Sequence, residues 1–204
     1  MSIKLTGTDL TLFRGERCLF KNLNFALNPG ELLLLEGRNG SGKTSLLRAI
    51  AGLLELESGE IEWNEEPVRK ERQFFQNSMV LMSHKVGFKG DLNLVENLQF
   101  ESNLRPQSGL DFEDILQRLG LGRLTRLPLR SLSAGQQRRV ALARMMLSAA
   151  PLWMMDEPVS NLDSDGRSLT KEILREHLQK GGMAIVAAHQ DIEIDAPTHR
   201  VRLQ

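Results

Sequence analysis

The run from Gly37 to Thr44 constrains the fold of this chain more than any other segment. It reads Gly-Arg-Asn-Gly-Ser-Gly-Lys-Thr and fits the pattern G-x-x-x-x-G-K-[ST], in which successive backbone N–H groups wrap a polyphosphate. Its glycines permit the positive φ angles that such a wrap requires. Residues 31–36 form a short apolar run typical of a buried strand, and residues 44–54 carry apolar side chains at helical spacing. A strand, a glycine-rich loop and a helix N-terminus together predict an anion-binding site.

Two side chains of this loop have specific expected contacts. Lys43 is expected to place its charge between the outer phosphates, and Thr44 to offer its hydroxyl to Mg²⁺. A glycine-rich turn that fits the pattern by chance is the alternative, which the flanking strand and helix disfavour. The expected nucleotide-binding residues here are Gly37, Arg38, Asn39, Gly40, Ser41, Gly42, Lys43, Thr44 and Ser45.

Composition narrows the class of protein. A chain of 204 residues holds one large domain, or one core with a small subdomain. Its 26 basic and 26 acidic residues balance, which argues against a general electrostatic footprint for nucleic acid. The single cysteine, Cys18, has no intramolecular partner, so we expect a reducing, cytosolic setting. No apolar stretch approaches the ~20 residues that span a bilayer, and no signal peptide is expected, so action at a membrane would need a partner.

Hydrophobic periodicity predicts an α/β fold. We expect strands at 3–13, 20–27, 32–36, 60–63, 152–155 and 183–188, and helices at 44–54, 92–100, 112–119, 136–150 and 164–180. Strand and helix alternate at both ends of the chain, which favours a parallel sheet covered by helices. The helical middle is then an insertion into that core.

Two acids end the apolar run 152–155, in which Trp153, Met154 and Met155 are expected to be core residues. At the carboxyl edge of a parallel sheet, Asp156 and Glu157 would face the ligand crevice. Asp156 is expected to bind Mg²⁺ through water, and Glu157 to polarise the attacking water as a general base. An exposed Asp-Glu pair after a core strand is the alternative.

Residues 132–136, Leu-Ser-Ala-Gly-Gln, suggest a second phosphate contact. Ser133 is a good N-cap for the helix that follows, and Gly135 lets a backbone approach a ligand closely. With the positive helix end, these groups could bind a γ-phosphate. Helix capping alone would also explain the serine.

In this order the motifs resemble those of the ATP-binding subunits of ABC transporters, over essentially the whole chain. Residues 37–44 are similar to Walker A, 152–157 to Walker B and 132–136 to the family signature; residues 160–163 and His189 are similar to the D-loop and the switch histidine. The resemblance implies a RecA-like P-loop NTPase fold with a parallel-sheet core, an antiparallel β subdomain and an inserted α-helical subdomain. The core would cover about 1–84 and 146–204, and the helical subdomain about 85–145.

The resemblance also implies the working unit. Two nucleotide-binding domains of the family pack head-to-tail as a homodimer, and each ATP, with Mg²⁺, lies between Walker A of one copy and the signature of the other. Ser133, Gly135 and Gln136 would then act on the partner's nucleotide. Asp163 would couple the two sites, and His189 would contact the γ-phosphate. Integral membrane subunits would be partners, with the chain peripheral at the cytoplasmic face of the cell membrane and without nucleic acid.

Two positions depart from the family pattern. Members usually carry an aromatic residue, often Tyr, that stacks on adenine near the end of the first strand. This chain has no Tyr, and Phe13 occupies that place, where stacking on adenine and packing in the core are both open. His84 stands where most members have Gln, in the linker to the helical insertion.

A finer resemblance is to the haem-exporter ATPases of cytochrome c maturation. It is carried by residues 84–89, 91–98 and 37–48, although Ser83 and Asn93 depart from the usual residues. It implies ATP-driven coupling to the membrane proteins of that system. The alternative is a soluble ABC-type ATPase that acts on ribosomes or DNA. A P-loop kinase or GTPase is disfavoured by the signature.

Overall fold

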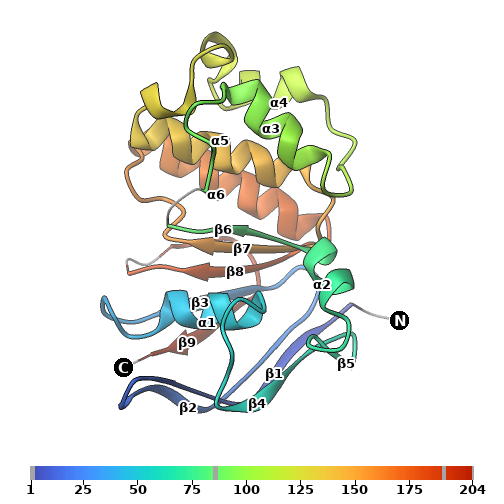
Figure 1. Cartoon of the computed structure of the whole chain (residues 1–204), viewed down its shortest axis with the longest axis vertical. Coiled ribbons are helices and arrows are strands. Elements are labelled where there is room, and N and C mark those ends of the chain that lie inside the picture. The colour runs from blue at the N-terminus through green and yellow to red at the C-terminus, as the bar shows by residue number, and fades with distance from the viewer. Residues whose placement is uncertain (1–2, 85–86, 190–191, 204) are drawn as a thin grey trace.

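The computed structural model describes residues 3–84, 87–189 and 192–203 as a stack of layers. In Figure 1, helices α3, α4, α5 and α6 cover one face of a five-stranded sheet, and α1 lies between the other face and a second sheet. The strands are β1 Leu5–Arg14, β2 Arg17–Leu27, β3 Leu32–Glu36, β4 Ser58–Trp63, β5 Glu66–Pro67, β6 Met79–Met82, β7 Leu152–Asp156, β8 Met183–Ala187 and β9 Thr198–Arg202. The α-helices are α1 Lys43–Ile50, α2 Arg72–Ser78, α3 Leu94–Ser102, α4 Phe112–Arg118, α5 Ala134–Leu147 and α6 Ser164–Gln179, and two short 3₁₀ turns span Gly122–Leu124 and Leu129–Ser131.

The central sheet is parallel throughout and has the order β6-β7-β8-β3-β9. Strand β3 is buried on both faces, which is why it reads as an uninterrupted leucine run. Its alternate side chains enter different cores: Leu32 and Leu34 face the helical layer, and Leu33 and Leu35 face the second sheet. The α/β expectation is confirmed. The parallel order also brings the carboxyl ends of β3 and β7 to one edge.

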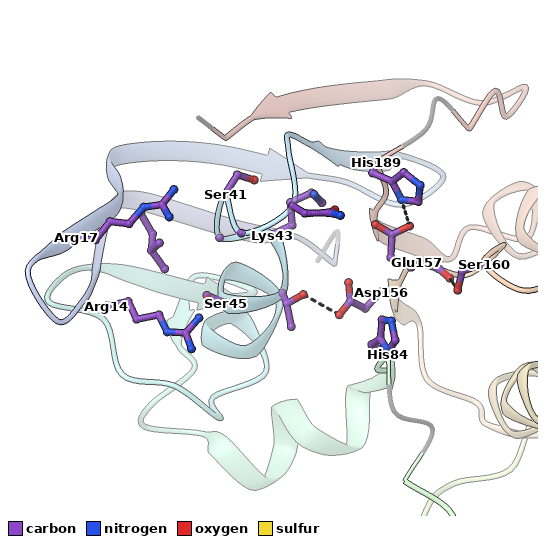
Figure 2. Close-up of a pocket in the computed structure, with 15 residues that line it drawn as sticks. Arg14, Arg17, Ser41, Lys43, Ser45, His84, Asp156, Glu157, Ser160 and His189 are labelled. Carbon is purple, nitrogen blue, oxygen red and sulfur yellow. Dashed lines mark hydrogen bonds and ion pairs between the residues drawn. The ribbon is translucent and has the colours of Figure 1, made fainter. Parts of the chain in front are cut away.

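The second sheet is antiparallel, with the order β2-β1-β4-β5. Strands β1 and β2 form a hairpin whose turn includes Gly15 at φ 60°. In the hairpin register Phe13 lies opposite Cys18, and Arg14 lies opposite Arg17. The expected antiparallel β subdomain is therefore present, and its hairpin ends beside the phosphate loop (Figure 2).

The helical layer packs directly on the parallel sheet. One apolar cluster includes Leu98 of α3, Leu116 of α4 and Val140 of α5 together with Val186 of β8. Trp153 and Met155 belong to this cluster, whereas Met154 joins the cluster between the two sheets. The expectation that all three are core residues is confirmed.

Several boundaries and elements differ from the sequence-based expectation. The helix expected at 44–54 ends at Ile50, because Gly52 adopts φ 69°, and the helix expected at 136–150 spans 134–147. The elements β5, α2, β6 and β9 were not expected. Strand β6 has only four residues and α2 only seven, and β9 is an edge strand rich in polar residues, so none shows a periodic pattern. Within the described ranges no helix is both long and apolar enough to cross a membrane.

Candidate functional site

A cavity of about 480 Å³ opens at the carboxyl edge of the parallel sheet (Figure 2). Residues from β1, β2, the loop after β3, α1, the segment after β6, the end of β7 and the segment after β8 meet there. Its lining residues are Arg14, Arg17, Leu19, Asn39, Gly40, Ser41, Gly42, Lys43, Thr44, Ser45, His84, Asp156, Glu157, Ser160 and His189. The fold thus brings together most of the residues that the sequence nominated for ATP chemistry, including the linker residue His84.

The loop before α1 has the backbone that a polyphosphate wrap requires. Gly37, Gly40 and Gly42 have φ angles of 147°, 81° and 106°, which L side chains rarely adopt. Gly42 is the N-cap of α1 and supplies no side chain to cap the helix, so the first-turn N–H groups remain available to an anion. Gly37 does not line the cavity; a Cβ there would overlap the carbonyl of Leu203, so this glycine serves close packing.

Two polar groups of the loop are held for a ligand. The Lys43 ammonium donates to the carbonyl oxygens of Gly37 (2.6 Å) and Arg38 (3.2 Å), folded back on its own loop although only 7% of the residue is exposed. The Ser41 Oγ is buried without a hydrogen-bond partner among the described residues. Buried polar groups are normally paired, so these contacts fit a site that is completed by a bound oxyanion.

A pair of hard oxygen atoms lies beside the loop. Thr44 Oγ1 donates to Asp156 Oδ2 over 2.9 Å, and Asp156 is only 3% exposed. Among the described residues no cluster of three or more His, Cys, Asp or Glu side chains could cage a metal ion. Two oxygens beside a phosphate site suit Mg²⁺, which takes few protein ligands and completes its shell with water and phosphate. The donor set therefore fits the expected ion.

Glu157 and His189 form the second polar pair of the cavity. His189 Nδ1 lies 2.7 Å from Glu157 Oε2, and a carboxylate oxygen only accepts, so Nδ1 carries the proton of this bond. The Glu157 side chain is 16% exposed and that of His189 47%, so water reaches the pair. Glu157 also adopts φ 53°, a conformation uncommon outside glycine and found at functional sites.

The hairpin contributes two arginines that the sequence reasoning missed. Arg14 and Arg17 are cross-strand neighbours and both line the cavity, whereas Phe13 does not. Side chains alternate along a strand, so a residue next to Arg14 faces away from the cavity. Stacking of Phe13 on adenine stays a prediction, and the core alternative is wrong, because Phe13 is 43% exposed. The register of β1 against β2 places the two arginines on the cavity side, and no sequence motif marks them.

The signature residues lie outside this cavity. Ser133 caps α5: its Oγ accepts from the Gln136 N–H (3.2 Å), and the Gln136 Oε1 accepts from the Ser133 N–H (2.9 Å). A Cβ on Gly135 would lie 2.8 Å from the Asn161 carbonyl, so glycine permits the loop before α6 to pack closely here. None of Ser133, Gly135 and Gln136 lines the cavity of the same chain. The capping role is real, and it leaves the Ser133 hydroxyl proton free to donate elsewhere.

Asp163 likewise has a structural contact in the single chain. Its Oδ1 accepts from the Gly166 N–H at the start of α6 (2.8 Å) and from Arg139 of α5 (3.2 Å). The hydrogen bond from Gly166, followed by the charge of Arg139, lowers the pKa of the Asp163 carboxyl. Of the linker, residues 85–86 lie outside the described residues. Ser160, the first residue of the D-loop run 160–163, also lines the cavity.

The profile of the ABC transporter family matches residues 20–160 of the chain. The "Cytochrome c biogenesis ATP-binding export protein CcmA" of Vibrio cholerae is 43% identical over 194 residues, which are 94% of either chain. The protein of the same name from Methylococcus capsulatus is 42% identical over 192 residues, 93% of either chain. A putative ABC transporter ATP-binding protein from Pyrococcus furiosus has a similar fold, with a TM-score of 0.83 at 23% identity over 97% of this chain and 96% of that one. The chain belongs to the ABC transporter family, as an ATP-binding subunit that hydrolyses ATP.

Proposed function

We propose that this subunit binds Mg²⁺-ATP in the cavity beside α1 and hydrolyses it there only when a second copy completes the site. One observation carries the proposal. The cavity gathers the phosphate loop, the Thr44–Asp156 pair and the Glu157–His189 pair, yet none of the signature residues reaches it. The contact of the signature with the γ-phosphate, which the family pattern implies, would then come from a second copy of the chain.

The phosphate contacts follow from the loop. The first-turn N–H groups of α1 and the Lys43 ammonium, turned from its own loop carbonyls toward the ligand, would bind the outer phosphates, and the buried Ser41 hydroxyl would gain its missing partner. Thr44 and Asp156 would hold Mg²⁺, which neutralises charge on the phosphates.

Glu157 is placed to act on water. In this proposal its carboxylate accepts a proton as the water oxygen attacks the γ-phosphorus, and the bond from that phosphorus to the β-γ bridging oxygen breaks to leave ADP. The His189 Nδ1–H fixes one carboxylate oxygen, and its Nε2 can contact the γ-phosphate. His84, which lines the same cavity, would report the bound nucleotide to the linker.

Arg14 and Arg17 are proposed as nucleotide contacts in addition to Phe13. Arg14 and Arg17 lie opposite each other, and like charges at opposed strand positions repel. A bound anion would reduce this repulsion. A guanidinium plane stacks on a nucleobase or binds a phosphate bidentately. Both arginines are therefore proposed to contact the nucleotide on the side away from Mg²⁺.

In the proposed homodimer, each copy supplies the signature contacts to the nucleotide bound by the other copy. Ser133, Gly135 and Gln136 of one copy would contact the nucleotide of the other, with the α5 N-terminus adding its positive end. The Asp163 loop, which touches α5 through Arg139, would couple the two sites. The region of about 85–145 would act as a helical subdomain against a core of about 1–84 and 146–204.

The relatives named CcmA suggest the setting. We propose that the chain works in an ATP-driven export complex of cytochrome c biogenesis. Haem would be the exported species, and integral membrane subunits would be the partners. The chain would sit peripherally at the cytoplasmic face of the membrane. Its balanced charge supports a role without nucleic acid, which disfavours the alternative of an ATPase that acts on ribosomes or DNA.

The Glu157→Gln variant tests the proposal. Glutamine keeps the shape of the side chain but cannot accept the proton, so ATP should bind and trap a dimer on size exclusion, with turnover lost. Full turnover, or a monomer in saturating ATP and Mg²⁺, would contradict the proposal.

Affinity isolation from solubilised membranes tests the proposed export complex. Recovery of integral membrane proteins with the chain supports it, and recovery of ribosomes in their place contradicts it.

A further inference from the structure

A buried arginine in α5 contacts the main chain behind the catalytic pair. Arg138 is 5% exposed and lies in the helix that begins at the signature serine. Its guanidinium donates to the carbonyl oxygens of Ser83 (3.1 Å), Asp156 (3.2 Å) and Glu157 (2.6 Å), and to the Ser160 hydroxyl (2.7 Å). Within the described part of the chain it makes no ion pair with a carboxylate, so its direct hydrogen-bond partners are main-chain carbonyls and one hydroxyl.

These acceptors surround the residue that carries the general base. The Glu157 carbonyl accepts from Arg138, from the Ser160 hydroxyl (2.8 Å) and from the Ser160 N–H (3.1 Å), while the Glu157 N–H donates to the Ala187 carbonyl (2.8 Å). Both peptide groups of Glu157 are thereby fixed. Such fixing is what a non-glycine residue at φ 53° needs in order to keep that conformation.

The same guanidinium reaches the linker. Ser83 immediately precedes His84, which lines the nucleotide cavity, and Ser160 stands in the loop that leads to Asp163. Burial lowers the pKa of Arg138, and the nearby Asp156 and Glu157 charges oppose this effect, yet an arginine stays charged at any ordinary pH. The planar guanidinium joins two segments: Nη1 donates to Ser83 after β6, and Nη2 is shared among the acceptors of Asp156, Glu157 and Ser160 at the end of β7.

We propose that Arg138 is a positioning residue for hydrolysis: it holds Glu157 in its left-handed conformation and passes a displacement of α5 to the Glu157 carboxylate. This inference rests on the proposed role of Glu157 as general base. Arg138 touches no substrate atom. Because α5 begins at Ser133, docking of the signature on a partner's nucleotide would move α5 and thereby shift Glu157, the general base of the same chain.

The test compares Arg138→Gln with Arg144→Gln, in the full chain with its membrane subunits where turnover needs them. Arg144 is the matched control: it lies in the same helix and donates to the Leu81 carbonyl (2.8 Å), away from the cavity. Both variants should unfold at lower temperature. Per folded molecule, Arg138→Gln should lower kcat roughly tenfold to a hundredfold with KM for ATP nearly unchanged, because a small misplacement of a catalytic group costs about that much. Arg144→Gln should keep its kcat.

A double-mutant cycle separates positioning from general damage. In the Glu157→Gln background the Arg138→Gln change should have no further effect on single-turnover hydrolysis, since there is no base left to position. Arg138→Lys should restore only part of the rate, because an ammonium cannot span the same acceptors. Where Arg138→Gln does not fold, Ser160→Ala removes one link between the guanidinium and Glu157 and should still lower kcat several-fold.

Three results would overturn the inference. The first is an unchanged kcat in Arg138→Gln or, where that variant does not fold, in Ser160→Ala. The second is an equal loss of kcat in Arg144→Gln, and the third is losses of rate that multiply in the Arg138→Gln, Glu157→Gln double variant. The single Glu157→Gln variant keeps the two proposals apart. Full turnover in it defeats the general-base assignment, whereas its inactivity together with a fully active Arg138→Gln defeats only the positioning role.

Discussion

Acidification should destabilise this subunit through His177, and the size of the effect can be worked out from the ring's surroundings. His177 in α6 stacks on Trp153, with ring centroids 4.0 Å apart and planes at 10°, and its Nε2 lies 3.2 Å from the Met183 carbonyl. Burial lowers the pKa of His177 from 6.5 to about 4. The folded chain therefore keeps this ring neutral where an unfolded chain protonates it.

The sign and magnitude follow from proton linkage. Above the unfolded pKa of 6.5 both states hold a neutral ring and His177 has no pH effect. As the pH falls toward the folded pKa of about 4, the unfolded state binds the extra proton and stability is lost. Between about pH 7 and about pH 5 these pKa values give a loss of about 2 kcal/mol, and the loss is complete only below the folded pKa.

Urea denaturation followed by circular dichroism measures this loss. Carboxylates titrate over part of the same range, so the informative quantity is the difference between the wild type and His177→Gln, whose amide can still donate to the Met183 carbonyl. The wild type should lose about 2 kcal/mol more than His177→Gln between the two pH values. Equal slopes for wild type and His177→Gln, or a His177 ring that titrates near 6.5 by NMR, would refute the reasoning.

Three further predictions concern the nucleotide site. Lys43→Ala should weaken binding of a fluorescent ATP analogue about tenfold or more, as expected for a lost charge-assisted hydrogen bond; unchanged affinity would remove Lys43 from the phosphates. Ser133→Arg should bind ATP as a monomer yet fail to dimerise on size exclusion, and a dimerising, active variant would defeat the proposal of a shared site. Thr44→Val should raise the Mg²⁺ concentration needed for half-maximal turnover while ADP affinity without metal stays close to wild type; an unaltered Mg²⁺ requirement would show that the hydroxyl is no ligand.

The local chemistry of the site was predictable from the sequence because each motif occupies a few contiguous residues. The glycines of the phosphate loop, the acids after β7 and the cap of α5 can each be recognised from such a short run. The apolar runs of β3 and β7 likewise predict buried parallel strands, and the sheet follows from their alternation with helices.

Contacts between distant segments could not be read in that way. Whether Arg14 or Phe13 lines the cavity depends on the register and bulges of β1 against β2, since one residue of shift exchanges the two faces. The edge strands β6 and β9 are too short or too polar to show a period and form only because the sheet offers them a neighbour. Arg138 is one basic residue among several in α5 until folding brings residues 83, 156, 157 and 160 around it.

Residue types at fixed short spacing thus identify the groups that can bind triphosphate and act on water, because motif chemistry depends on local spacing. Folding determines which of those groups share one cavity and which contacts hold them in place. The phosphate loop, Asp156, Glu157 and His189 converge because parallel strands end at one edge. The signature stays outside the cavity because the start of α5 packs against the loop at Asn161.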